Sequence, residues 1–154
     1  MITARGPQVL EFNCRFGDPE TQAIVKRMEG DFAEALEASI EGRVSEGDFK
    51  WSQEAAVCVV LSSAGYPGEY ESGKPIFGLQ EAAQVPGVKV FHAGTARRGS
   101  DYVTAGGRAL GVTASAPELA AAVERAYAAV SLIKFEGMHY RKDIAARALA
   151  QTAK

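Results

Sequence analysis

Glu11, Asn13 and Arg15 are the residues whose types and spacing best suit chemistry in this chain. If residues 9–16 form a strand, these three side chains share one face and apolar residues occupy the other. Neighbouring side chains on one face then lie roughly 6.6 Å apart along the strand. A carboxylate and an amide oxygen suit a hard cation, and a guanidinium suits a phosphate that the cation bridges. The same alternation is also typical of an ordinary strand with a solvated polar face.

Two short helices are predicted after this strand. Asp18 is a suitable N-cap with Pro19 at the first helical position, and Gly30 is placed to end that helix. Asp31 then caps a second helix, whose apolar residues recur every four positions before Gly42. The opening part of the chain is therefore expected to be a strand followed by two helices.

A polar stretch at 44–52 separates this part from a β-rich region. We expect the stretch to be a boundary or linker, with Trp51 anchoring it against the following unit. Beyond it, Gly106–Gly107 is expected to be a hairpin turn. Pro117 opens a predicted helix that should cover the sheet and end near Lys134. Three β-branched runs predict short strands: 55–63, 88–93 and 108–114.

The helix after Pro117 and the tail that follows it have their own patterns. The tail at 139–150 fits a short surface helix, tied down by Arg141 near Asp143. Arg108 is expected to be solvated or to support a turn. His92 and His139 have no partner at metal-ligand spacing, so both are expected to be hydrogen-bonded structural groups. The apolar stripe of the helix comprises Leu119, Val123, Tyr127 and Val130.

Composition limits the classes of partner and compartment. The 154 residues are enough for one core, and a formal net charge of −2 gives no electrostatic argument for nucleic acid or an acidic membrane. Cys14 and Cys58 fall on apolar faces of predicted strands, which favours buried reduced thiols over a disulfide or a metal site. The longest apolar run, 55–61, is too short to span a bilayer, so a cytoplasmic location is expected by default.

Residues 11–22, Glu-Phe-Asn-Cys-Arg-Phe-Gly-Asp-Pro-Glu-Thr-Gln, closely resemble the signature segment of the phosphoribosylamine–glycine ligase family, the glycinamide ribonucleotide synthetases of purine synthesis. Further landmarks of that family follow in order along the chain: 65–68, 90–95, 106–108, 112–114, 126–127 and 140–144. The resemblance therefore covers nearly the whole chain. It implies an α+β protein in which residues 1–50 end an ATP-grasp catalytic domain, as a strand plus two helices. Residues 51–154 would form a small β-rich C-terminal domain like a barrel-sandwich hybrid, with a covering helix.

The resemblance also implies an ATP-dependent ligase that joins 5-phosphoribosylamine and glycine, with ADP and phosphate released. Glu11 and Asn13 match the family's Mg²⁺ (or Mn²⁺) ligands. Arg15 matches a catalytic position near the transferred phosphate. Asp18 and Glu20 lie in the following turn and could face the amine substrate, although a helix cap and a first-turn carboxylate explain both residues structurally.

The family's enzyme is much longer, and its nucleotide-gripping lysine, its glycine-rich loop and an upstream acidic metal ligand have no counterpart in these residues. Met1–Thr3 resemble an internal stretch of the family. We therefore expect this chain alone to be inactive. One departure concerns Ala145, where the family pattern has Gly, and we expect the backbone there to be re-formed as helix.

Three other functions remain open on the sequence. The chain could be a non-catalytic module that completes a separate N-terminal half, or a relic without chemistry. A biotinyl or lipoyl carrier domain is disfavoured, because no turn presents a lysine beside a methionine as the swinging arm requires. Another ATP-grasp ligase would keep the metal face but should differ at Gly17 and around His92, and both segments match the glycine ligase.

Overall fold

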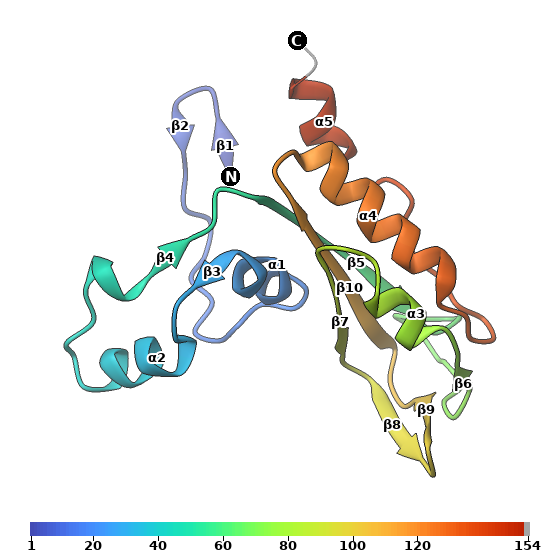
Figure 1. Ribbon diagram of the computed structural model, residues 1–154. Helices are drawn as coiled ribbons and strands as arrows, with labels where there is room; N and C mark the ends of the chain where they lie inside the picture. The colour runs from blue at the N-terminus through green and yellow to red at the C-terminus, as the bar shows by residue number, and fades with distance from the viewer. Residues whose placement is uncertain (153–154) are drawn as a thin grey trace.

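The computed structural model describes residues 1–152 and is built around an antiparallel sheet in the order β5-β10-β7 (Figure 1). The three strands are β5 at Ala55–Ser62, β7 at Val88–His92 and β10 at Arg108–Ala116. Each overlaps a strand that the sequence predicts, with bounds that agree to within two residues. Their β-branched side chains suit a sheet that is packed on both faces.

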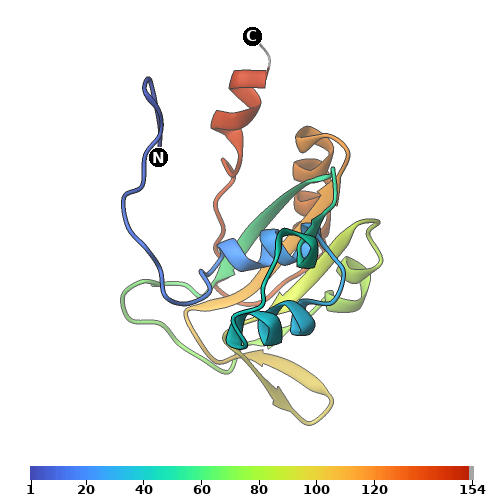
Figure 2. The same ribbon diagram turned by 90° about the vertical axis from the view of Figure 1, so that its left-hand side faces the viewer.

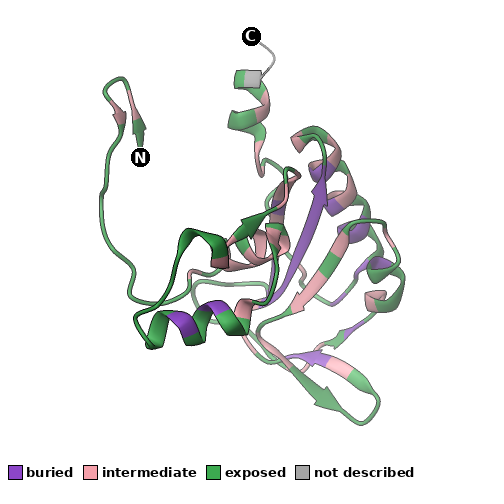
Figure 3. Ribbon diagram, turned by 60° about the vertical axis from the view of Figure 1, so that its left-hand side comes forward, coloured by how far each residue is buried: buried purple, intermediate pink, exposed green. Residues whose placement is uncertain are grey.

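One face of this sheet is covered by α3 (Leu79–Ala83) and α4 (Leu119–Leu132). Figure 3 shows the buried residues concentrated in β10 and on the side of α4 that meets it. The buried side of α4 consists largely of alanines, which let the helix approach the strands closely. Of the predicted stripe, Val130 is buried, while the other three members lie half-buried at its margin. The fully buried residues of α4 are Ala122, Ala126, Ala129 and Val130.

The other face of the sheet contacts α1 (Glu20–Arg27) (Figure 1). Gly111 of β10 makes this approach possible, because a Cβ there would already lie 3.2 Å from Cys58 Sγ and 3.7 Å from Gln22 Cγ. The first part of the chain therefore packs on the second through one short helix.

A second, smaller sheet has the order β6-β9-β8. Its strands are β6 at Pro75–Ile76, β8 at Thr95–Arg98 and β9 at Asp101–Thr104, and the β8–β9 hairpin projects beyond the main sheet (Figures 1 and 2). Gly106–Gly107 connects β9 to β10 in the other sheet, so the expected hairpin turn there is wrong. The mixed α+β class is confirmed, but the two sheets of residues 55–116 form no closed barrel.

Residues 8–16 have no regular structure, so the strand expected there is wrong. A short hairpin of β1 (Ile2–Thr3) and β2 (Gly6–Pro7) precedes them, away from the rest of the molecule (Figure 2). A strand needs a neighbour for its backbone N–H and C=O groups, and none of the described residues supplies one. Cys14, expected to be buried, is exposed. The apolar side chains are also exposed: Val9 by 73%, Leu10 by 71%, Phe12 by 86% and Phe16 by 59%.

In the rest of the first part, a helix and a short turn lie between two strands that pair with each other. Asp31 caps α2 (Phe32–Ile40) as predicted, because its Oδ1 accepts hydrogen bonds from the N–H groups of Ala33 and Glu34. A 3-10 turn, η1, follows at Glu46–Asp48. Then β4 (Lys50–Trp51) pairs with β3 (Met28–Glu29), which places Trp51 opposite Met28. Trp51 therefore pairs with a strand of the first part.

The tail contains α5 (Ala146–Thr152), preceded by Ala145 in a left-handed conformation with φ +64°. The expectation that helix would replace this conformation at Ala145 is wrong. Tyr127 holds the turn: its hydroxyl donates to the carbonyl of Arg141 at 2.8 Å and accepts from the N–H of Ile144 at 3.2 Å. The predicted pairing of Arg141 with Asp143 is confirmed, with two hydrogen bonds of 2.8 and 2.6 Å. No helix within residues 1–152 has the length and apolar character needed to cross a membrane.

Candidate functional site

Glu11 and Asn13 lie together at the surface. Asn13 Nδ2 donates to Glu11 Oε1 at 3.3 Å, and both side chains are exposed. This arrangement leaves Glu11 Oε2 and Asn13 Oδ1 outside the mutual hydrogen bond, and these are hard oxygen donors of the kind that Mg²⁺ prefers. No group of three or more His, Cys, Asp or Glu side chains among residues 1–152 is placed to hold a metal ion. The pair fits part of a magnesium site, with other ligands still required.

Arg15 follows on the same segment and is exposed. Its Nη1 donates to the neighbouring carbonyl of Phe16, at 3.3 Å. The ring of Phe16 meets the edge of Phe32 at a centroid distance of 5.6 Å, which ties the segment to α2. The guanidinium is therefore accessible, but the structure does not bring it into contact with Glu11 or Asn13.

Asp18 is not the cap of α1, contrary to expectation. The N-cap is Pro19, and no side chain caps this helix. The carboxylate of Asp18 instead accepts from Gln22 Nε2 at 2.9 Å and lies 3.4 Å from Arg108 Nη1. These partners compete for the oxygens that a cap would use. Glu20 does lie in the first turn of the helix, as predicted.

Arg108 was expected to be solvated or to support a turn, but it contacts two other segments of the chain. Its Nη1 also donates to the backbone carbonyl of Asp18, and its guanidinium lies 5.7 Å from the ring centroid of Tyr66. Ser63 donates through its N–H to Gly107 O at 2.8 Å and through its hydroxyl to Gly106 O at 3.0 Å. Three landmark segments far apart in sequence, around residues 18, 66 and 107, therefore meet at one place.

A pocket of about 350 Å³ lies where these segments meet. Cys58 and Val60 of β5 contribute to it, and burial raises the pKa of the Cys58 thiol. The side chains lining the pocket include two guanidinium groups and no carboxylate. Around it are Pro19, Tyr66, Arg108, His139, Arg141 and Ile144. A cue to this pocket in the sequence was the Gly-Gly-Arg landmark, but its neighbours come from distant segments.

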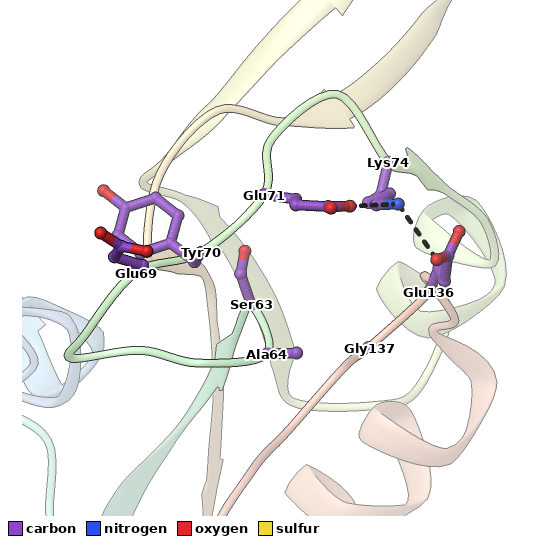
Figure 4. A pocket seen from close by; sticks show the side chains of 8 residues that line it. All are labelled: Ser63, Ala64, Glu69, Tyr70, Glu71, Lys74, Glu136 and Gly137. Atoms are coloured by element: carbon purple, nitrogen blue, oxygen red, sulfur yellow. Dashed lines mark hydrogen bonds and ion pairs between the residues drawn. The ribbon is translucent and has the colours of Figure 1, made fainter.

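A second hollow, of about 320 Å³, lies beside the loop that follows β5 (Figure 4). Lys74 Nζ there pairs with Glu71 Oε2 at 2.8 Å and with Glu136 Oε1 at 3.0 Å. The hydrogen bonds that Lys74 donates to Glu71 and to Glu136 raise the pKa of Lys74, and the bond to Glu71 lowers the pKa of that carboxyl group. The three charges fasten this loop to the segment after α4, so the hollow has a structural explanation.

His92 has the structural role that was predicted. Its Nδ1 lies 2.9 Å from Thr95 Oγ1, and its ring is 4.4 Å from that of Tyr102. Partial burial lowers the pKa of His92 below its usual value. His139 forms a backbone bridge with Ser62, and its side chain lines the pocket beside Arg108.

Comparison with known proteins finds relatives that match nearly the whole chain. The chain is 48% identical, over 95% of its length, to a phosphoribosylamine–glycine ligase of Caldanaerobacter subterraneus subsp. tengcongensis. It is 50% identical, over 94% of its length, to the chloroplastic enzyme of that name from Arabidopsis thaliana. It is 46% identical, over 97% of its length, to the human trifunctional purine biosynthetic protein adenosine-3. The chain spans 34%, 28% and 15% of these relatives, respectively.

A solved structure agrees with these sequences. The crystal structure of phosphoribosylamine–glycine ligase from Thermotoga maritima matches with a TM-score of 0.75 and 33% identity. The match covers 93% of this chain and 34% of that one. The family described as phosphoribosylglycinamide synthetase, C domain, matches residues 56–147, which include the main sheet and α4. From these matches, the chain belongs to the phosphoribosylglycinamide synthetase family.

Proposed function

We propose that this chain is the C-terminal portion of a phosphoribosylamine–glycine ligase of de novo purine synthesis. The complete enzyme would join 5-phosphoribosylamine and glycine, and convert ATP to ADP and phosphate. The observation that carries the proposal is the 48% identity, over 95% of the chain, to a relative of that name, of which the chain spans about a third. Residues 1–50 would then complete an ATP-grasp catalytic domain, and residues 51–154 would form the C-terminal domain.

Glu11 and Asn13 would supply two oxygen ligands to Mg²⁺ or Mn²⁺. Their adjacency on one segment supports this role, because Asn13 Nδ2 lies 3.3 Å from Glu11 Oε1 and the two side chains are therefore already together. A divalent cation bound there would neutralise charge on nucleotide phosphates. Arg15 would hold the charge that develops as the glycine carboxylate becomes an acyl phosphate, for which a planar and permanently charged guanidinium is suited.

The chain alone would not turn over, because two oxygen ligands are too few to select a metal–nucleotide complex. The exposed apolar side chains of residues 9–16 support the same proposal. In a larger catalytic domain this segment would gain a neighbouring strand, and Leu10 and Phe12 would gain an apolar surface to pack on.

The test is complementation. The chain would be mixed with the part of the Caldanaerobacter enzyme that lies outside the matched region, and ADP release would be measured with glycine and phosphoribosylamine. We expect activity from the mixture and from neither part alone. Glu11→Gln should lower the activity of the mixture about 100-fold, as loss of a catalytic charge contact does. Arg97→Gln, which removes a charge from the β8–β9 hairpin, is the matched control and should leave it unchanged. Activity of the lone chain, or an undiminished Glu11→Gln variant, would contradict the proposal.

A non-catalytic module that completes a separate N-terminal half is the second candidate function. The exposed apolar residues of the 9–16 segment favour it, since they need a partner surface whether or not Glu11 takes part in chemistry. The same mixture separates the two functions. For a purely structural module, Glu11→Gln would leave both assembly and activity intact.

A further inference from the structure

The segment at 9–16 is open to another chain along its whole length. Each of its residues is exposed, and Figures 2 and 3 show it running clear of both sheets. Within residues 1–152, its backbone N–H and C=O groups have no backbone partner. Unpaired backbone beside exposed apolar side chains is a template on which a strand of a second molecule can pair.

The charges of this segment are complementary to themselves. Glu11 lies two residues before Asn13, and Arg15 lies two residues after it. When two copies run antiparallel with Asn13 opposite Asn13, Glu11 of each copy therefore faces Arg15 of the other. A twofold pairing of this kind makes each favourable contact twice. Opposite charges directly across two strands stabilise the pair, and like charges destabilise it.

The apolar side chains match in the same register. Leu10 of each copy faces Phe16 of the other, and Phe12 faces Cys14. A slip by one residue would set polar side chains against apolar ones. A slip by two residues in either direction keeps the two faces but removes both contacts between Glu11 and Arg15. The register centred on Asn13 is therefore the one that satisfies charge and apolar pattern together.

We propose that residues 9–16 pair with the same residues of a second copy of this chain, as an antiparallel ribbon about a twofold axis at Asn13. The ring of Phe16 already packs on Phe32, so each end of the ribbon stands on one α2 helix. Pairing straightens the bend at Cys14 and Arg15, and two strands alone are only marginally stable. The dimer is therefore weak, with a Kd on the order of 100 µM. This inference concerns the chain by itself and does not rest on the proposed function.

The first experiment measures the oligomeric state of the 154-residue protein by sedimentation equilibrium, between about 10 µM and 1 mM. A reductant keeps the exposed Cys14 from forming a disulfide. We expect a monomer–dimer equilibrium. Glu11→Lys and Arg15→Glu should each weaken it at least about tenfold, because each variant replaces two attractive contacts by two repulsive ones. Arg97→Glu makes the same change of charge on the projecting hairpin and should alter the Kd less than about twofold.

Mixing the variants tests the register. In an equal mixture of the Glu11→Lys and Arg15→Glu proteins, the two basic side chains of one copy face the two acidic side chains of the other. We therefore expect a heterodimer with a Kd within about threefold of the parent's. The control mixture is Glu11→Lys with Arg97→Glu, in which the second protein has the same net charge. One repulsive contact remains there, so this heterodimer should be weaker. Recovery of affinity would also show that both variants are folded and competent to pair.

Three outcomes would overturn the inference. One is a parent protein that stays monomeric up to about 1 mM. Another is a mixture of Glu11→Lys and Arg15→Glu that associates no more tightly than the control mixture. The third is a dimer that neither charge reversal weakens, which would place the interface on another surface. None of these results bears on complementation, which tests the ligase activity separately.

Discussion

The ring of Tyr66 occupies the space that a side chain at position 107 would need. A Cβ built on Gly107 would lie 2.1 Å from Tyr66 Cδ2 and 3.0 Å from its Cγ. The backbone at Gly107 is not left-handed, so the requirement for glycine here is one of space. Because the same ring lies beside the guanidinium of Arg108, the contact between Gly107 and Tyr66 fixes one wall of the pocket.

Gly107→Ala should therefore destabilise the protein by about 1 to 3 kcal/mol, the usual range for a group forced into occupied space. Urea denaturation followed by circular dichroism would measure the change. Gly47→Ala is the matched control, because the nearest atom to a Cβ there, Ser45 Oγ, is at an ordinary distance of 3.6 Å. The control should stay within about 0.5 kcal/mol of the parent. Equal effects of the two substitutions would refute this explanation of Gly107.

Ala145→Gly should stabilise the protein. Ala145 has φ +64°, a conformation that costs a residue with a Cβ about 1 to 2 kcal/mol and costs glycine almost nothing. The greater freedom of glycine in the unfolded chain offsets part of this gain, so we expect about 0.5 to 1 kcal/mol. Thermal unfolding would show a higher Tm.

The control for Ala145→Gly is Ala128→Gly, at an exposed position inside α4. There the same substitution should destabilise by about 1 kcal/mol, because the backbone is helical. A lower Tm for Ala145→Gly would mean that the left-handed turn before α5 does not form in solution.

The two cysteines should differ in reactivity. Cys14 is exposed, whereas Cys58 is partly buried on β5 and burial raises its pKa, so its reactive thiolate is scarcer. Iodoacetamide at pH 8 should label Cys14 at least about tenfold faster, as measured by mass spectrometry of the peptides. Removal of the fast phase by Cys14→Ser would assign it. Labelling of both peptides at one rate would show that α1 does not cover Cys58.

Local sequence patterns predicted the elements that depend mainly on residues close together in the chain. The β-branched run of β5 and the cap at Asp31 each depend on a few neighbouring residues, and both form as predicted. The β8–β9 hairpin was missed because both strands are short, and β8 is mostly exposed and carries two arginines, so it lacks the apolar alternation of a half-buried strand. The predicted strand at 9–16 does not form in this chain because a strand depends on its neighbours as much as on its own alternation.

The candidate site also has one part that the sequence predicted and one part that it did not. Glu11 and Asn13 are two residues apart, and a resemblance confined to one segment is enough to pair them. Arg108 and Asp18 are 90 residues apart, and Arg108 gives no local sign that it reaches across the molecule. The pocket between four segments could therefore be found only in the folded chain.

His92 lies at the junction of the two sheets, where its imidazole hydrogen-bonds to Thr95 and packs on Tyr102. Burial holds its pKa below 6.5, the value for a free histidine. As pH falls, the unfolded chain therefore takes up a proton at this residue before the folded protein does. The contribution to stability is complete above about pH 6.5 and is lost as pH falls through the lowered pKa.

His92→Gln removes this proton-linked loss while keeping a side chain that can hydrogen-bond to Thr95. We expect the free energy of unfolding of the parent to fall relative to that of the variant between pH 7.5 and pH 5, as measured by urea denaturation at both values. Above pH 7 the difference between the two proteins should be constant, because the imidazole is then neutral in the folded and unfolded states alike. An NMR titration of the His92 ring supplies the direct test. Two results would show that the contact with Tyr102 does not desolvate the ring. One is a titration midpoint at or above 6.5, and the other is a stability difference between the parent and the variant that does not change with pH.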